Sequence, residues 1–303
     1  MSLRIAITGS TGLIGSSLVS FLLKEGHQIT QISRKKELKG PKTPVILWNP
    51  DKGEIDIDAL EGFDVIIHLA GANVGERWDV RDHKQAILDS RVNGTGLLCR
   101  TLASLKNKPK VLLSASAIGF YGNHDAEVIL SEDSLPGDGF LADVCRKWET
   151  ATKPASEANI RVVNLRFGVV LSKNGGALAK MWLPFQLGLG GVLGSGKQMM
   201  SWVALNEIPW IVLFLINSGH IYGPVNVVAP HPVTNADFTK TLGDVIHRPT
   251  FLPVPAFAVQ LLFGEMGEVL LLGGSYVVAK RLQELGYKYQ YPHLKEALIK
   301  AIA

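Results

Sequence analysis

The spacing of glycines near the N-terminus constrains the fold of this 303-residue chain more than any other feature. An apolar run at residues 3–8 leads into Thr8-Gly9-Ser10-Thr11-Gly12-Leu13-Ile14-Gly15 and then into 13–24, whose apolar residues recur with helical spacing. A strand, a G-x-x-G-x-x-G loop and a helix in this order predict the start of a nucleotide-binding unit. A purely structural glycine-rich turn is the alternative. The predicted phosphate-binding residues are Gly9, Thr11, Gly12, Leu13, Ile14 and Gly15.

Strands and helices are expected to alternate through the first half of the chain. The expected strands are 28–32, 63–69, 110–114 and 161–165 with 169–171, and the expected helices between them are 79–106 and 140–159. This alternation predicts an α/β fold with a Rossmann-type doubly wound parallel sheet.

After residue 172 the pattern changes to glycine-rich and proline-rich sequence. We expect a helix at 202–216, a strand at 225–228 and a short amphipathic helix at 293–302. The sequence therefore predicts a dinucleotide-binding domain over 1–170 and a smaller α+β substrate domain over 171–303, partly interleaved with the first.

Composition excludes several classes of protein. Apolar residues make up 47% of the chain and charged residues 19%, which argues against disorder. The net charge of +4 comes with no reader motif, so no nucleic-acid binding is expected. The longest apolar run, 208–216, is far shorter than the roughly 20 residues that span a bilayer. Cys99 and Cys145 suggest neither a disulfide framework nor a metal site, and we expect a cytoplasmic protein without metal.

The end of the second predicted strand indicates the cofactor. An acidic residue is usual there when NAD binds, because it bonds the ribose hydroxyls. This chain instead has Ser33, Arg34 and Lys35. A hydroxyl and a guanidinium suit a 2′-phosphate, so NADP(H) is predicted over NAD(H). A solvated basic turn is the alternative.

Several strings carry a resemblance to a known family. TGSTGLIG (8–15), DVIIHLAG (64–71) and SASAIGFYG (114–122) resemble the extended short-chain dehydrogenase/reductases. GANVGERW (71–78) and FLADVCRKWE (140–149) resemble an atypical epimerase-like branch, sugar-nucleotide-epimerase-like NAD(P)-binding proteins that sometimes carry a cell-division inhibitor label. The resemblance covers nearly the whole chain.

This resemblance implies further cofactor contacts. Segments like HLAG line the adenine-ribose side of the cofactor, Arg91 would reach its phosphates, and the chain after the sixth strand passes the nicotinamide. An ordinary strand end, or an ion pair of Arg91, is the alternative in each case. The additional cofactor-binding candidates are Leu69, Ala70, Gly71, Arg91, Ser114, Arg166 and Gly168.

The chain departs from the superfamily in its catalytic residues. The resemblance implies a Tyr-x-x-x-Lys pair at positions where this chain has Leu141 and Cys145. Ser116 matches the usual Ser/Thr position, and Tyr121 is the best remaining proton donor. Both have a packing or turn role as the alternative.

The loop after HLAG supplies two substrate-binding candidates. Arg77 could hold an anionic group and Trp78 could stack on a substrate, with surface packing as the alternative. They follow a strand end, where open α/β sheets bind ligands.

Two functional hypotheses follow from the sequence. A third, RNA binding by a reductase-like fold, has no RNA-recognition motif to support it. The first is an NADP-dependent oxidoreductase or epimerase acting on a small carbonyl or nucleotide-sugar-like substrate. The second is a non-catalytic NADP(H)-binding regulatory or redox-sensing protein, because losing a general acid costs about 10²–10⁴ in rate. Relatives also suggest a homodimer through the helices 79–106 and 140–159.

Overall fold

The molecule is built around one large sheet, described by a computed structural model over residues 2–38, 40–78 and 82–303. Its neighbouring strands run parallel except for the last pair, β3 and β4. The order across the sheet is β12 (Gly223–Val227), β8 (Arg161–Phe167), β6 (Val111–Ala117), β5 (Val65–His68), β1 (Arg4–Thr8), β2 (Gln28–Ser33), β3 (Val45–Asn49) and β4 (Glu54–Ile55). The predicted Rossmann-type doubly wound fold is confirmed.

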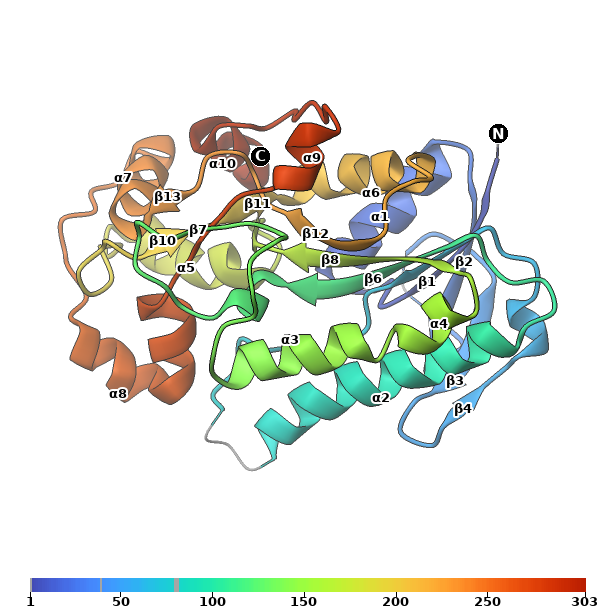
Figure 1. Cartoon of the computed structure of the whole chain (residues 1–303). Coiled ribbons are helices and arrows are strands. Elements are labelled where there is room, and N and C mark those ends of the chain that lie inside the picture. Colours follow the sequence, from blue (N-terminus) through green and yellow to red (C-terminus); the bar gives the residue numbers. More distant parts are fainter. Residues whose placement is uncertain (1, 39, 79–81) are drawn as a thin grey trace.

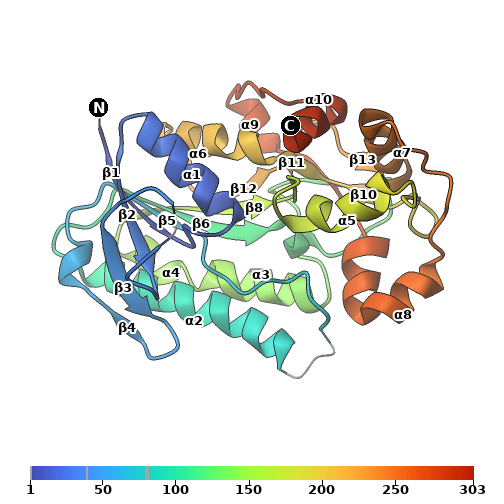
Figure 2. The ribbon, with the colours of Figure 1, turned by 180° about the vertical axis from the view of Figure 1, so that it is seen from behind.

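Helices cover both faces of this sheet (Figures 1 and 2). The central strands β1, β5 and β6 are continuously apolar because side chains on both of their faces are buried. One face carries α2 (His83–Ser104), α3 (Phe140–Thr150) and α4 (Lys153–Glu157), and the other carries α1 (Leu13–Lys24) and α6 (Ile208–Asn217).

Most of the remaining elements gather beyond the carboxyl ends of the parallel strands (Figure 1). Short sheets pair β9 with β11, β10 with β13, and β7 with β14. The strands are β7 (Ile129–Leu130), β9 (Val169–Leu171), β10 (Met199–Met200), β11 (Trp202–Ala204), β13 (Val233–Thr234) and β14 (Tyr276–Val277). The helices are α5 (Gly176–Gln186), α7 (Asn235–Ile246), α8 (Ala256–Gly267), α9 (Lys280–Glu284) and α10 (Leu294–Ile302), with helical turns at Asp58–Leu60, Ile118–Tyr121, Leu205–Glu207 and Glu268–Leu272.

Some element boundaries differ from the prediction. The helix expected over 202–216 begins only at Ile208, because Trp202–Ala204 pairs with β9. The helix expected over 140–159 is divided into α3 and α4, with Pro154 in the first turn of α4, where its missing N–H does no harm. The first three residues of the helix expected over 79–106 lie outside the described residues.

Two elements from the second half of the chain lie in the layers formed by the first half. β12 hydrogen-bonds to β8 in the central sheet, and α6 packs against α1. Residues 208–227 therefore return to the layers of the first half. Among the described residues, no helix has both the length and the apolar character needed to cross a bilayer.

Candidate cofactor and substrate site

The glycine-rich loop is shaped by close contact of three elements. Gly9 has a φ of +65°, and a Cβ there would lie 2.7 Å from the backbone carbonyl carbon of Leu69. A Cβ on Gly15 would lie 2.2 Å from the carbonyl oxygen of Gly9. These two glycines let β1, β5 and α1 approach so closely that no larger residue fits.

The N-terminus of α1 is open toward an anion. Gly12 is the N-cap residue, no side chain caps it, and no acidic residue lies in the first turn. A Cβ on Gly12 would meet only the Gly9 oxygen, at 3.3 Å, so the space in front of the helix is clear. Leu13 and Ile14 contribute first-turn N–H groups beside the exposed Thr11. Free N–H groups and the helix dipole both favour a phosphate at such a position.

The end of β5 is fixed to the loop by a buried hydrogen-bond chain. The hydroxyl of Thr8 accepts from the N–H groups of Leu69 at 3.0 Å and Ala70 at 3.3 Å. His68 bonds the same hydroxyl at 2.7 Å and reaches Thr95 on α2 at 2.9 Å. Burial lowers the pKa of His68 to about 4. Leu69–Gly71 therefore stands at a rigid sheet edge.

His68 is expected to make stability depend on pH. Its folded-state pKa of about 4 lies below the ordinary 6.5, so the unfolded chain binds the proton more readily. The free energy of unfolding should therefore fall by about 3 kcal/mol as the pH drops from above 6.5 to below 4. The free energy of unfolding is measured by urea denaturation at several pH values in this range. It should depend less steeply on pH in His68→Asn than in the wild type, and the exposed His220→Gln variant serves as the control. An equal pH dependence of the free energy of unfolding in the wild type and in His68→Asn would contradict the lowered pKa of His68.

Arg91 on α2 is a buried cation with spare donors. Its Nη1 donates to the carbonyls of Ala72 at 3.0 Å and Ile87 at 3.1 Å, and a Cβ on Gly71 would lie 3.3 Å from its Cζ. Burial lowers the pKa of this guanidinium. In the part of the chain that the structure describes, Arg91 forms no ion pair. A guanidinium has five N–H donors, so an anion at this edge would find several of them uncommitted.

Ser33, Arg34 and Lys35 lie together where β2 ends. The Ser33 hydroxyl accepts from the Lys35 N–H at 3.1 Å, which forms a turn. The Arg34 side chain is 72% exposed and stands 3.9 Å from Asp51, so this pair is too solvated to hold it firmly. The guanidinium is therefore accessible to a ligand phosphate.

The predicted catalytic residues Ser116 and Tyr121 lie in a buried network. Ser116 donates to Glu149 at 2.7 Å, and Glu149 forms a two-bond ion pair with Arg166 at 2.8 Å. Arg166 donates to the Tyr121 hydroxyl at 2.9 Å, and that hydroxyl donates to Asn226 at 2.7 Å.

This network argues against proton transfer to a substrate by Ser116 or Tyr121. Tyr121 is fully buried, burial raises its pKa, and neither residue lines the pocket described below. Cys145, at the position of the usual lysine, is also buried, and burial raises its pKa to about 12.

Three other predicted cofactor residues, Arg166, Gly168 and Ser114, lie in the protein interior. The Arg166 side chain is held by Glu149, as described above. A Cβ on Gly168 would lie 2.5 Å from the Ser201 carbonyl oxygen, so this glycine permits β11 to approach. Ser114 is fully buried in β6, and within the described residues its hydroxyl has no hydrogen-bond partner.

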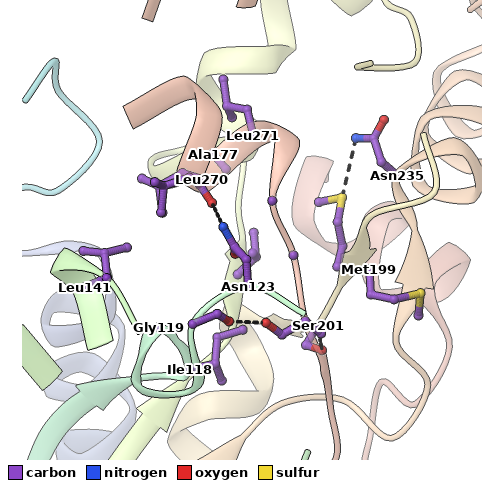
Figure 3. Close-up of a pocket in the computed structure, with 18 of the residues that line it drawn as sticks. Ile118, Gly119, Asn123, Leu141, Ala177, Met199, Ser201, Asn235, Leu270 and Leu271 are labelled. Atoms are coloured by element: carbon purple, nitrogen blue, oxygen red, sulfur yellow. Dashed lines mark hydrogen bonds between the residues drawn. The ribbon is translucent and has the colours of Figure 1, made fainter. Parts of the chain in front are cut away.

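A pocket of about 340 Å³ opens beside the carboxyl ends of β6 and β8 (Figure 3). Its walls come from the segment after β6, the start of α3, α5, β10, and the turn after α8. Most of its lining is apolar, including Ile118, Leu141, Met181, Met199, Leu270 and Leu271. Asp138 is the one titratable side chain among the described residues that line it.

The pocket and the glycine-rich loop are neighbours. A Cβ on Gly175 would lie 3.2 Å from the side chain of Leu13, so the start of α5 packs on the first turn of α1. The next residues of α5, Ala177 and Met181, line the pocket. Lys180 of α5 donates to the carbonyl of Gly75 in the loop after β5. A ligand extending from α1 along this edge would therefore meet the pocket.

The predicted substrate-binding pair occupies the rim behind the pocket wall. Trp78 is 4% exposed, donates to the Val74 carbonyl and contacts Phe140 edge to face at 5.3 Å. Phe140 lines the pocket, whereas Trp78 supports it from behind. Arg77 donates to the carbonyl of Leu262 on α8 at 3.3 Å. Neither Arg77 nor Trp78 belongs to the pocket lining.

Sequence reasoning missed Asp138 and the apolar wall at Leu270 and Leu271. Asp138 stands in Pro136-Gly137-Asp138-Gly139, a turn-forming string just before α3. This string was a usable signal, because polar residues that precede a helix at the carboxyl edge of a sheet tend to face the ligand. Leu270 and Leu271 carry no local signal, since only the tertiary fold brings them to the pocket.

Comparisons with known proteins agree with this geometry. The family model described as "NAD dependent epimerase/dehydratase family" matches residues 5–228, and one described as "Domain of unknown function (DUF1731)" matches 254–301. Epimerase family protein Mb2239 of Mycobacterium bovis is 40% identical over 294 residues, covering 97% of this chain and 96% of that protein.

A solved structure extends the likeness to three dimensions. The crystal structure of human epimerase family protein SDR39U1 (isoform 2) with NADPH matches with a TM-score of 0.89 and 33% identity, covering 99% of each chain. The curated human sequence is 34% identical over 305 residues. Because sequence, family model and fold agree along nearly the whole chain, this protein belongs to the NAD dependent epimerase/dehydratase family and is an SDR39U1-like extended short-chain dehydrogenase/reductase.

Proposed function

We propose that the chain is an NADP(H)-dependent oxidoreductase that interconverts a carbonyl and an alcohol. The observation that carries this proposal is the contact between the open N-terminus of α1 and α5, whose next residues line the pocket. A dinucleotide that starts at α1 would bring its far end to that pocket.

The residues at the sheet edge fit the parts of such a cofactor. The first turn of α1, from Gly12 to Gly15, and Arg91 would hold the pyrophosphate, with Leu69–Gly71 along the adenosine ribose. Ser33, Arg34 and Lys35 would hold the 2′-phosphate. The solved human relative is a complex with NADPH, which supports the same choice here.

The pocket supplies one candidate for proton transfer. When bound, the nicotinamide supplies a hydride to the carbonyl carbon or accepts one from the alcohol carbon. We assign Asp138 the matching proton step, in which its carboxyl gives a proton to the carbonyl oxygen and is reprotonated from water. Ser116 and Tyr121 are positioning residues, because their network with Glu149 and Arg166 fixes the end of β6 beneath the pocket.

Arg34→Ala is expected to weaken NADPH binding by about 10–100-fold and to leave NADH binding unchanged. The reason is that only NADPH carries the 2′-phosphate that the guanidinium would bond. Fluorescence titration of both cofactors measures this, with exposed Lys36→Ala on the same turn as the matched control. Equal affinity of the wild-type chain for NADPH and NADH would overturn the assignment.

One observation favours a second candidate, a non-catalytic NADP(H)-binding sensor. Within the described residues, neither a tyrosine nor a lysine lines the pocket. Tight NADPH binding, with no NADPH oxidation over a broad carbonyl panel, would favour the sensor over the reductase.

A further inference from the structure

The polar side chains in the pocket wall are largely occupied by the protein itself. Ser201 donates to the Ser275 carbonyl at 2.8 Å and accepts from the Val277 N–H at 2.8 Å. Asn123 donates to the Val269 carbonyl at 3.2 Å, as Figure 3 shows. These groups have little capacity left for the hydroxyls of a ligand.

Two further polar groups are also committed. The Asn235 oxygen accepts from the Leu193 N–H at 2.9 Å, and its nitrogen approaches the sulfur of Met200 at 3.8 Å. The Ser275 hydroxyl donates to the Gly122 carbonyl at 2.5 Å. Among the described lining residues, Asp138 is the titratable one.

The pocket also carries no positive charge for a phosphate. Neither an arginine nor a lysine is found among the described residues that line it. The uncapped N-terminus of α3, from Gly139 to Ala142, also lines the pocket, and its free N–H groups are the feature that would meet an anion there.

The wall that remains is apolar and adaptable. Three methionines, Met181, Met199 and Met200, line the pocket together with Leu141 and Leu271. Figure 3 labels Met199 and the two leucines. Methionine side chains rearrange easily around apolar ligands. The volume of about 340 Å³ lies near the lower end of the range for small-molecule sites.

We infer that the pocket binds an uncharged, mainly apolar ketone or aldehyde. This inference rests on the proposed function, which supplies the carbonyl chemistry. The carbonyl oxygen would face Asp138, the proposed proton donor, and the carbon chain would lie along the methionine and leucine wall.

A matched ligand series tests the inference by binding as well as by turnover. The NADPH-saturated protein is titrated calorimetrically with 2-alkanones from 2-butanone to 2-decanone, with fructose and with UDP-glucose. Each buried methylene should tighten binding by about fourfold until the pocket is filled. Fructose and UDP-glucose should bind more weakly than any alkanone of five carbons or more.

The outcomes separate the ligand class from the proposed function. Absent alkanone binding, no chain-length dependence, or tighter binding of UDP-glucose or fructose would each overturn the inference. Alkanones that bind with chain-length dependence but are not reduced would support the apolar class and count against the reductase. Reduction of NADP+ with UDP-glucose, together with no activity on the alkanones, would support the oxidoreductase and count against the apolar ligand class.

A pair of variants at one position locates the bound ligand. Leu271→Asp should weaken alkanone binding by about tenfold or more, because a carboxylate then faces the carbon chain. Leu271→Met, which conserves volume, should change it by less than about threefold. NADPH affinity and melting temperature report whether each variant is folded. Unchanged alkanone binding in a folded Leu271→Asp variant would contradict this placement of the ligand.

Discussion

Asp138→Asn is expected to lower kcat by about 10²–10⁴ while leaving the Kd of NADPH unchanged. The amide keeps the size and polarity of the side chain but removes its exchangeable carboxyl proton. Steady-state rates with an alkanone substrate and NADPH titration measure the two quantities separately.

Asp125→Asn provides the matched control for this experiment. Asp125 is an exposed aspartate in the same region that does not line the pocket, so its substitution should leave both quantities unchanged. If Asp138→Asn retained full kcat, the proton would come from another group, and the assignment of Asp138 would be wrong.

Gly12→Asp is expected to weaken NADPH binding by about 100-fold or more without destabilising the fold. Aspartate is a favourable N-cap residue, so the free energy of unfolding should stay within a few tenths of a kcal/mol or rise. The same carboxylate would project into the clear space before α1 and repel the pyrophosphate. NADPH titration and urea unfolding of one preparation test both halves of this prediction.

Gly219→Asp is the control for this substitution. A Cβ on Gly219 would meet no atom within 4 Å, and the residue lies away from the sheet edge. Gly219→Asp should therefore bind NADPH like the wild type. A Gly12→Asp variant with normal NADPH affinity would exclude the N-terminus of α1 as the phosphate site.

The fold could be predicted because its signals are local. The glycine loop, the apolar strand and the following helix occupy fewer than 25 consecutive residues, and each carries its own period. The predicted helix boundaries are wrong where pairing with a distant segment determines the local structure. Trp202–Ala204, for example, forms a strand because it pairs with β9. Local propensity cannot report such a partner.

The surroundings of the predicted catalytic residues could not be read from the sequence for the same reason. Tyr121 follows a strand end, which favours an active-site role, but its hydroxyl is bonded by Asn226, 105 residues later, and by Arg166, 45 residues later. These contacts bury it beneath the sheet edge. The pocket itself joins residues from Ile118 to Ser275, so its apolar character was not readable from any one segment.

The most direct measurement of the central claim follows the hydrogen that moves. NADPH deuterated at C4 of the nicotinamide, on either face in separate samples, is incubated with the protein and a saturating 2-alkanone, and the alcohol is analysed by mass spectrometry. The account predicts one deuterium on the carbinol carbon from one of the two samples and none from the other. Alcohol formed without deuterium from either sample, or no alcohol at all with NADPH bound, would contradict it.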